Sequence, residues 1–64
     1  MQKFVEKMVK DKKELDEKIA KLNTFLATDT YNTLSQKEKK LRKDQFAAMS
    51  EYSRILKEII AIYL

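Results

Sequence analysis

The sequence predicts an all-α protein, a two-helix antiparallel hairpin that assembles into a helical homo-oligomer. The 64 residues contain no glycine and no proline, and 38% of them are charged, a composition typical of long helices. Apolar residues recur every three or four positions in both halves of the chain. The second half carries two such rows, and a single neighbouring helix covers only one, so further copies of the chain are expected to cover the other.

A long amphipathic helix is predicted from about residue 2 to 27. Its apolar residues alternate in steps of three and four, with Lys12 in the gap. Gln45 interrupts an apolar row in the second half in the same way. Each of these two side chains either faces an interface or pocket, or covers apolar surface with its stem while its polar end stays in solvent. The row in the first helix consists of Met1, Val5, Met8, Leu15, Ile19, Leu22 and Leu26.

A connector, with room for one helical turn, is predicted from about residue 28 to 35. Threonines with Asp29 and Asn32 favour turns, and Tyr31 and Leu34 are expected to fill its underside. The run that starts at Ser35 and reaches Glu38 then matches a capping box. In that motif the serine oxygen accepts the Glu38 N–H, and the glutamate reaches back to the serine N–H. The second helix should therefore run from about 36 to 63.

Two apolar rows on this second helix carry the prediction of self-association. A single domain of 1–64 is marginally stable unless something else holds it together. The chain has no cysteine for a disulfide and no histidine, so a structural zinc site is not expected either. Association between copies is the remaining way to stabilise the fold. One row is Leu41, Ala48, Tyr52, Ile55, Ile59 and Ile62, and the other is Phe46, Met49, Leu56, Ile60 and Tyr63, broken at Ser53.

The residue types argue against an enzyme and against a cofactor or metal. No histidine can act as a base near neutral pH, and no cysteine can act as a nucleophile. The acidic residues Asp11, Glu14, Asp16 and Glu17 have lysines nearby and are expected to be structural. The longest apolar run, residues 59–64, is far shorter than the roughly 20 residues that cross a bilayer. With no visible signal peptide, a cytoplasmic location is expected.

The excess of positive charge, +4 overall, is concentrated in two places. Lysines and one arginine cluster between residues 37 and 43. This cluster either contacts phosphate groups or is an ordinary solvated face at the start of the second helix. On the first helix Lys3, Lys7 and Lys10 share a face beside Phe4, which suits a ligand with phosphates and a stacking base, or equally an ordinary charged surface. Acidic residues are interleaved throughout, which disfavours a nucleic-acid polymer as partner.

The motifs resemble those of a group of small phage-encoded helical proteins that includes anti-CBASS sponges. KMVKDKKELDEKIAKLNTFL is similar to their run R-V-V-x-E-x-x-E-L-x-x-K-I-x-K-L-x-x-F. TYNTL corresponds to their connector with an aromatic residue and leucine. Gln45, Met49, Tyr52 and Leu56 then follow their pattern Q-x-x-x-M-x-x-Y-x-x-x-L. The resemblance spans nearly the whole chain and is carried largely by hydrophobic spacing.

The resemblance implies a compact helical hexamer that captures cyclic dinucleotides between subunits without turning them over. It implies that Lys18, in the K-I-x-K-L motif, contacts the ligand, and that an aromatic residue near the start of the first helix lines the pocket. Phe4 is the nearest candidate, and it would keep base stacking but lose a phenolic hydrogen bond. Two positions depart from the pattern: Lys7 replaces an arginine, and Ile59 replaces the arginine associated with cyclic trinucleotides.

Two functions of different classes follow from these observations. The first is a phage anti-defence protein in the cytoplasm of an infected bacterium, in which Lys18 pairs with a phosphate of a cyclic dinucleotide and Phe4 stacks on a base. Lys3 and Lys7 add positive field there, and Thr28 and Thr30 are candidates for hydrogen bonds to base edges. The alternative is a structural or adaptor oligomer whose apolar rows dock on a phage or host protein.

Overall fold

The computed structural model describes residues 2–64, and all of their regular structure is helical. Helix α1 (Lys3–Leu26) has 24 residues, α2 (Asp29–Asn32) has four, and α3 (Gln36–Tyr63) has 28. The all-α prediction is confirmed. The described residues contain three helices, of which two are long, and the short helix α2 lies where one helical turn was expected within the connector. Met1, assigned to the apolar row of the first helix, lies outside the described residues.

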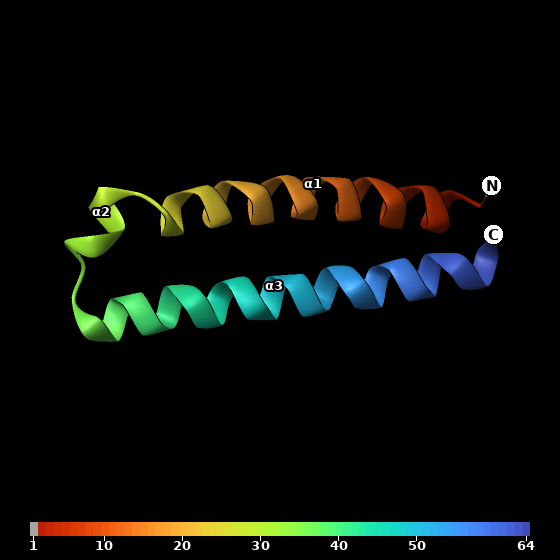
Figure 1. Cartoon of the computed structure of the whole chain (residues 1–64). Coiled ribbons are helices and arrows are strands. Elements are labelled where there is room, and N and C mark those ends of the chain that lie inside the picture. The colour runs from red at the N-terminus through yellow and green to blue at the C-terminus, as the bar shows by residue number, and fades with distance from the viewer. Residues whose placement is uncertain (1) are drawn as a thin grey trace.

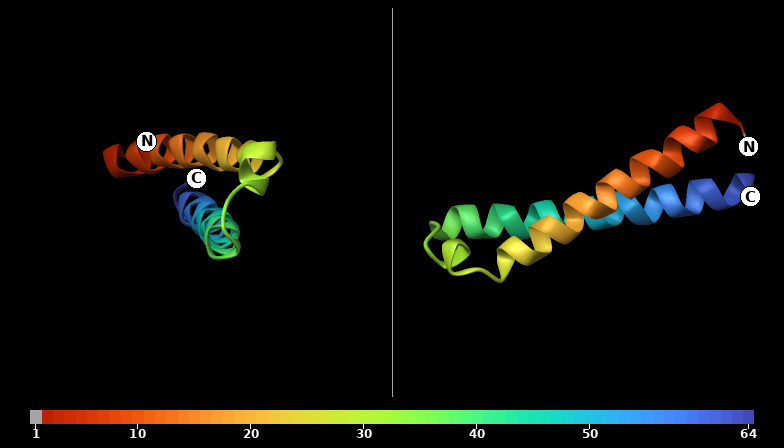
Figure 2. Two further views of the ribbon diagram at one scale, coloured as in Figure 1. Left: turned by 90° about the vertical axis from the view of Figure 1, so that its left-hand side faces the viewer. Right: turned by 90° about the horizontal axis from the view of Figure 1, so that it is seen from above.

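The two long helices lie side by side and run in opposite directions, with both ends of the chain at one end of the rod (Figure 1). Phe4 contacts Tyr63, Asp16 contacts Ser53, and Phe25 lies beside Arg42, so numbering falls along α3 as it rises along α1. Seen from above, the helices cross near their midpoints (Figure 2). The pairing is therefore antiparallel over the full length of the helices.

The molecule is a rod one helix pair thick. It measures 46 × 15 × 13 Å, with a radius of gyration of 14.7 Å. A compact chain of this length would have a radius of gyration of about 11 Å. Among residues 2–64 few apolar side chains are buried, namely Val5, Tyr31, Leu56 and Ile60, and of these Val5 is buried completely. A single copy thus has a narrow core, and the outward faces of both helices meet solvent.

Local sequence explains where the helices begin. The Ser35 hydroxyl accepts the Glu38 N–H at 3.1 Å, which confirms half of the predicted capping box. The other half is wrong, because the Glu38 carboxylate turns instead to Arg42, at 3.2 Å. Helix α2 is capped at its N-terminus by Thr28, whose hydroxyl accepts the Tyr31 N–H. Tyr31 is buried as predicted and its hydroxyl donates to the Lys39 carbonyl oxygen.

A polar network lies where the helices cross. The Ser53 hydroxyl donates to one Asp16 carboxylate oxygen, and the Lys12 ammonium donates to the other at 2.7 Å. Among residues 2–64 the Ser53–Asp16 bond is the only side-chain hydrogen bond that joins α1 to α3. The gap at Lys12 and the break at Ser53 in the apolar rows therefore meet at one point. A polar group between two packed helices is destabilising unless it is hydrogen-bonded. Any other alignment of the helices would break the Ser53–Asp16 bond, so this contact fixes how the helices align.

The same hydrogen bonds, from Lys12 first and then Ser53, hold the pKa of Asp16 below its usual 3.8. A carboxylate with a lowered pKa in the folded state stabilises the fold at pH values above its unfolded pKa. That contribution is lost as the pH falls through the folded-state value. The Asp16 side chain remains 45% exposed, so solvent screens much of the effect.

We expect Ser53→Ala to lower the free energy of unfolding by about 0.5–1.5 kcal/mol at neutral pH. The difference from the unsubstituted protein should shrink as the pH is lowered to about 2, because protonation of Asp16 weakens its hydrogen bond with Ser53. Urea unfolding at both pH values measures this. Ser50→Ala, on the same helix without a described side-chain partner, is the matched control. A difference that is equal at the two pH values would contradict the assigned role of Asp16.

Candidate functional site

One of the two apolar rows of α3 packs against α1 and the other is left uncovered. The packed row includes the buried Leu56 and Ile60, with Phe46 and Met49 half-buried. In the uncovered row Tyr52 is 55% exposed and Ile62 is 76% exposed. Ile59 is half-buried, and the remaining members are exposed. This uncovered row, called the outer row below, consists of Leu41, Ala48, Tyr52, Ile55, Ile59 and Ile62.

The outer row runs along most of α3. From residue 41 to 62 it extends about 32 Å at the helical rise. Asp44, Glu51 and Glu58 follow at intervals of seven residues along one side of it. Arg54 binds both Glu51 and Glu58, which raises the pKa of Arg54 and lowers the pKa of Glu51. The surface is therefore an apolar strip with a charged border, the anatomy of a protein interface.

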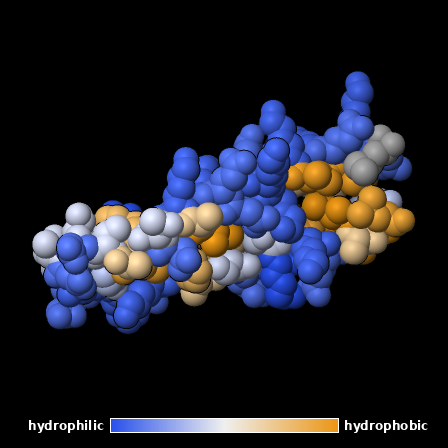
Figure 3. Space-filling view, turned by 45° about the horizontal axis from the view of Figure 1, so that its top comes forward, coloured by the Kyte–Doolittle hydropathy of each residue, from blue (hydrophilic) through white to orange (hydrophobic). Residues whose placement is uncertain are grey.

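Phe4, the predicted stacking residue, forms an aromatic pair with Tyr63 at the end of the rod that holds both termini. The ring centroids are 5.0 Å apart and the rings are nearly perpendicular, at 87°. Phe4 is 48% exposed, so part of its ring remains accessible. Hydrophobic side chains gather at this end of the molecule, whereas the flank formed by α1 is largely hydrophilic (Figure 3).

The predicted lysines lie on the exposed side of α1. Lys7 binds Asp11 at 3.1 Å through a largely exposed side chain. Lys3 and Lys18 are exposed, and neither forms an ion pair within residues 2–64. Because eleven residues make just over three turns, Lys7 and Lys18 point to the same side of the helix. Lys18 is thus available to an anion that approaches this face.

The two threonines belong to the connector. The Thr28 hydroxyl donates to the Phe25 carbonyl oxygen at 2.6 Å while it accepts the Tyr31 N–H, so capping uses both of its hydrogen-bonding functions. Thr30 is exposed, and its carbonyl oxygen accepts from the Thr33 hydroxyl at 2.6 Å. Thr30 is therefore the more accessible of the two.

A single chain does not bring the predicted site residues together. Lys3, Phe4 and Lys7 lie near the termini, while Thr28 and Thr30 lie at the connector end. Phe4 and Lys18 are about 21 Å apart along α1, too far to share a small ligand on one copy. The sequence predictions also missed Tyr63 as the neighbour of Phe4. Counting residues outward from Leu26 and Gln36 in antiparallel order places residue 58 opposite Phe4, so the contact with Tyr63 depends on the offset between the helices that the connector introduces.

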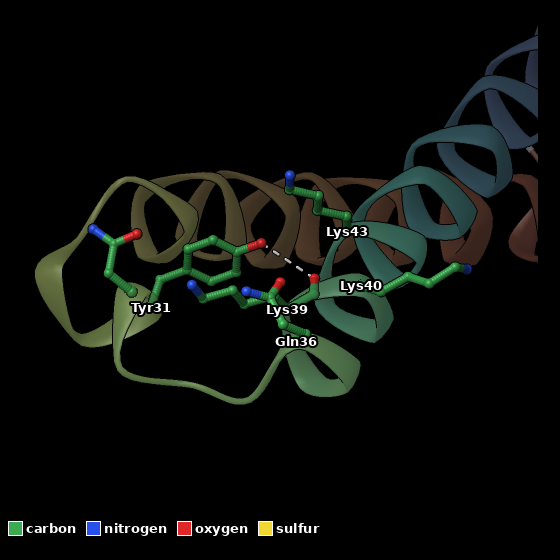
Figure 4. Close-up of a pocket in the computed structure, with 6 residues that line it drawn as sticks. Tyr31, Gln36, Lys39, Lys40 and Lys43 are labelled. Atoms are coloured by element: carbon green, nitrogen blue, oxygen red, sulfur yellow. Dashed lines mark hydrogen bonds between the residues drawn. The ribbon is translucent and has the colours of Figure 1, made fainter.

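A hollow lined by polar and charged side chains lies at the connector end, between α2 and the start of α3. Its volume is about 450 Å³. Figure 4 shows Lys39 running along the Tyr31 ring while Lys40 points away. The Lys40 ammonium donates to Asp44 at 2.8 Å, a hydrogen bond that raises the pKa of Lys40. The residues that line the hollow are Tyr31, Asn32, Gln36, Lys39, Lys40 and Lys43.

None of the three described helices is both long enough and apolar enough to cross a membrane. No curated protein and no solved structure matches the chain. One family model does match, that of Sequestin, and it aligns with residues 2–61. This alignment takes in α1, the connector and nearly all of α3, so it covers the whole hairpin rather than one motif. The chain therefore belongs to the Sequestin family.

Proposed function

We propose that this protein is a phage anti-defence protein that sequesters cyclic dinucleotides between copies of itself, without catalysis. The family name is compatible with a sequestering role. The observation that carries the proposal is the outer row, because a chain with four buried apolar side chains and an uncovered 32 Å apolar strip gains stability by self-association. Crevices between copies then provide places for a ligand.

A second copy suits the outer row better than an unrelated partner. The charges along the outer row do not oppose contact with the same row of a second copy, because Lys40 pairs with Asp44 and Arg54 pairs with Glu51 and Glu58, which leaves little net charge to repel. A second copy is also present wherever the chain is made. Self-association in a closed assembly, for which the sequence resemblance implies a hexamer, would cover the strip on every copy.

Assembly also offers a way to combine the separated site residues. Phe4 and Lys18 lie equally far from Asp11 along α1. Two α1 helices that approach antiparallel about Asp11 would bring Phe4 of one copy beside Lys18 of the partner subunit. By two-fold symmetry this arrangement gives two equal sites, each with an aromatic face and an ammonium group.

In this proposal Lys18 pairs with a phosphate, and Phe4 provides the stacking surface for a base. Lys3 and Lys7 raise the local positive potential, with Lys7 partly neutralised by Asp11. Tyr63, next to Phe4, supplies the phenolic hydroxyl that phenylalanine lacks. Thr30 remains a candidate for a base edge, while Thr28 would have to give up its capping bonds to take part.

Isothermal titration with a panel of cyclic dinucleotides tests this function. We expect at least one member to bind, and the bound nucleotide to be recovered intact after long incubation. A linear dinucleotide of the same bases is the control for charge alone. No heat from any cyclic member at tens of micromolar protein, together with a stoichiometric protein partner in pull-downs, would favour the adaptor alternative instead.

A further inference from the structure

The hollow at the connector end has features of a ligand site that the proposed interfacial site does not use. Its volume of about 450 Å³ falls within the roughly 300–1,000 Å³ typical of small-molecule sites. Tyr31 forms a fixed wall, because its hydroxyl is bonded to the Lys39 carbonyl oxygen at 3.2 Å and its ring packs on Phe25. The rigid wall comes from α2 and the charged residues come from α3, so the hollow is built between two elements.

Most of the net charge of the chain lies beside this hollow. Residues 36–44 contain five basic and two acidic side chains, an excess of three out of the total of +4. Both acids are engaged, Glu38 by Arg42 and Asp44 by Lys40. Within residues 2–64 neither Lys39 nor Lys43 forms an ion pair, and both line the hollow. Uncompensated cations near the start of a helix oppose its dipole, which a bound anion would relieve.

The spacing of the lysines indicates what kind of anion fits. Gln36, Lys39 and Lys43 lie on one face of α3, on successive turns about 5–6 Å apart. Two flexible lysine side chains that start one turn apart can place their ammonium groups on two linked phosphoryl groups, whereas one carboxylate would engage only one of them. The amides of Asn32 and Gln36 add hydrogen-bond donors and acceptors at the same hollow.

We propose that this hollow binds a small molecule with two adjacent phosphoryl groups, held by Lys39 and Lys43. A nucleoside diphosphate and free pyrophosphate share this chemistry. A nucleic-acid polymer fits less well, because the positive charge does not continue along α3, where Glu51 and Glu58 follow. The proposal is independent of the phosphate and base contacts of the interfacial site, which are assigned to Lys18 and Phe4 of α1.

Titration of the full ¹⁵N-labelled chain with pyrophosphate, and then with a nucleoside diphosphate, tests this site by NMR. We expect the amide signals of residues 31–43 to shift. Lys39→Gln and Lys43→Gln should each weaken binding roughly three- to tenfold. Lys37→Gln is the matched control, since it removes the same charge from the same cluster at a position that does not line the hollow. Tighter binding of the nucleoside diphosphate than of pyrophosphate would identify it as the better ligand.

Three results would overturn the proposal: no shifts at millimolar pyrophosphate, equal weakening by Lys37→Gln and Lys43→Gln, or tighter binding of a single-stranded oligonucleotide than of pyrophosphate. Equal weakening would mean that pyrophosphate responds to the overall positive charge of residues 37–43 rather than to a defined site. Binding of cyclic dinucleotides by Lys43→Gln distinguishes this proposal from the function proposed above. That binding should be unchanged even where pyrophosphate binding is lost.

Discussion

Ile55→Glu is expected to convert the proposed homo-oligomer into single chains of 7.6 kDa. Ile55 lies in the middle of the outer row, where its side chain is 40% exposed in one copy. Within an interface the introduced carboxylate would be desolvated without a partner, at a cost of several kcal/mol at each contact. Because every copy carries the change, the penalty is repeated around the assembly. Light scattering after size-exclusion chromatography measures the resulting mass.

Ala47→Glu provides the control for this variant. Residue 47 is exposed on the same helix, two turns before residue 55, and lies outside both apolar rows. It introduces the same charge and should leave the mass unchanged. Loss of helicity in Ile55→Glu, followed by circular dichroism, would mean that the hairpin depends on its neighbours. If Ile55→Glu has the same mass as the unsubstituted protein, the outer row does not form the interface.

Lys18→Ala is expected to weaken cyclic dinucleotide binding roughly tenfold or more. A hydrogen bond to a charged group contributes about 1.5–3 kcal/mol, and Lys18 has no described carboxylate partner that would compete for its ammonium group. The fold should be unaffected, because the side chain is exposed and alanine favours helix. Isothermal titration gives the change in affinity, and thermal unfolding shows that the fold is retained.

Lys13→Ala is the matched control for Lys18→Ala. Lys13 is exposed on the same helix, but it points about 140° away from Lys18 at 100° per residue. Both variants lower the net charge of the chain by one, so a difference between them reports position rather than overall field. Full affinity in a folded Lys18→Ala variant would exclude Lys18 from the site.

The helical class and the division of α3 into two rows could be predicted because both depend on local periodicity. A period of three to four residues determines which side chains share a face, and the structure packs one row and leaves the other exposed. The start of α3 was also predictable, because a serine hydroxyl satisfies the Glu38 N–H only at that spacing.

The remaining features depend on contacts between distant parts of the chain, which periodicity does not specify. Nothing local distinguishes Ser53 from an ordinary break in a row, yet it donates to Asp16 across the helix pair. The Glu38 carboxylate has two candidate donors nearby, the Ser35 N–H and the Arg42 guanidinium, and it pairs with Arg42 because the charged donor forms the stronger bond. Tyr63 reaches Phe4 only because the connector sets the antiparallel alignment.

The proposed function depends most on the ligand being held between copies of the chain rather than on a single copy. Native mass spectrometry with a cyclic dinucleotide that binds in titration tests this claim directly. We expect masses at multiples of the 7.6 kDa chain, with nucleotide retained only by the multimers. A folded 7.6 kDa monomer that carries the nucleotide by itself would contradict it.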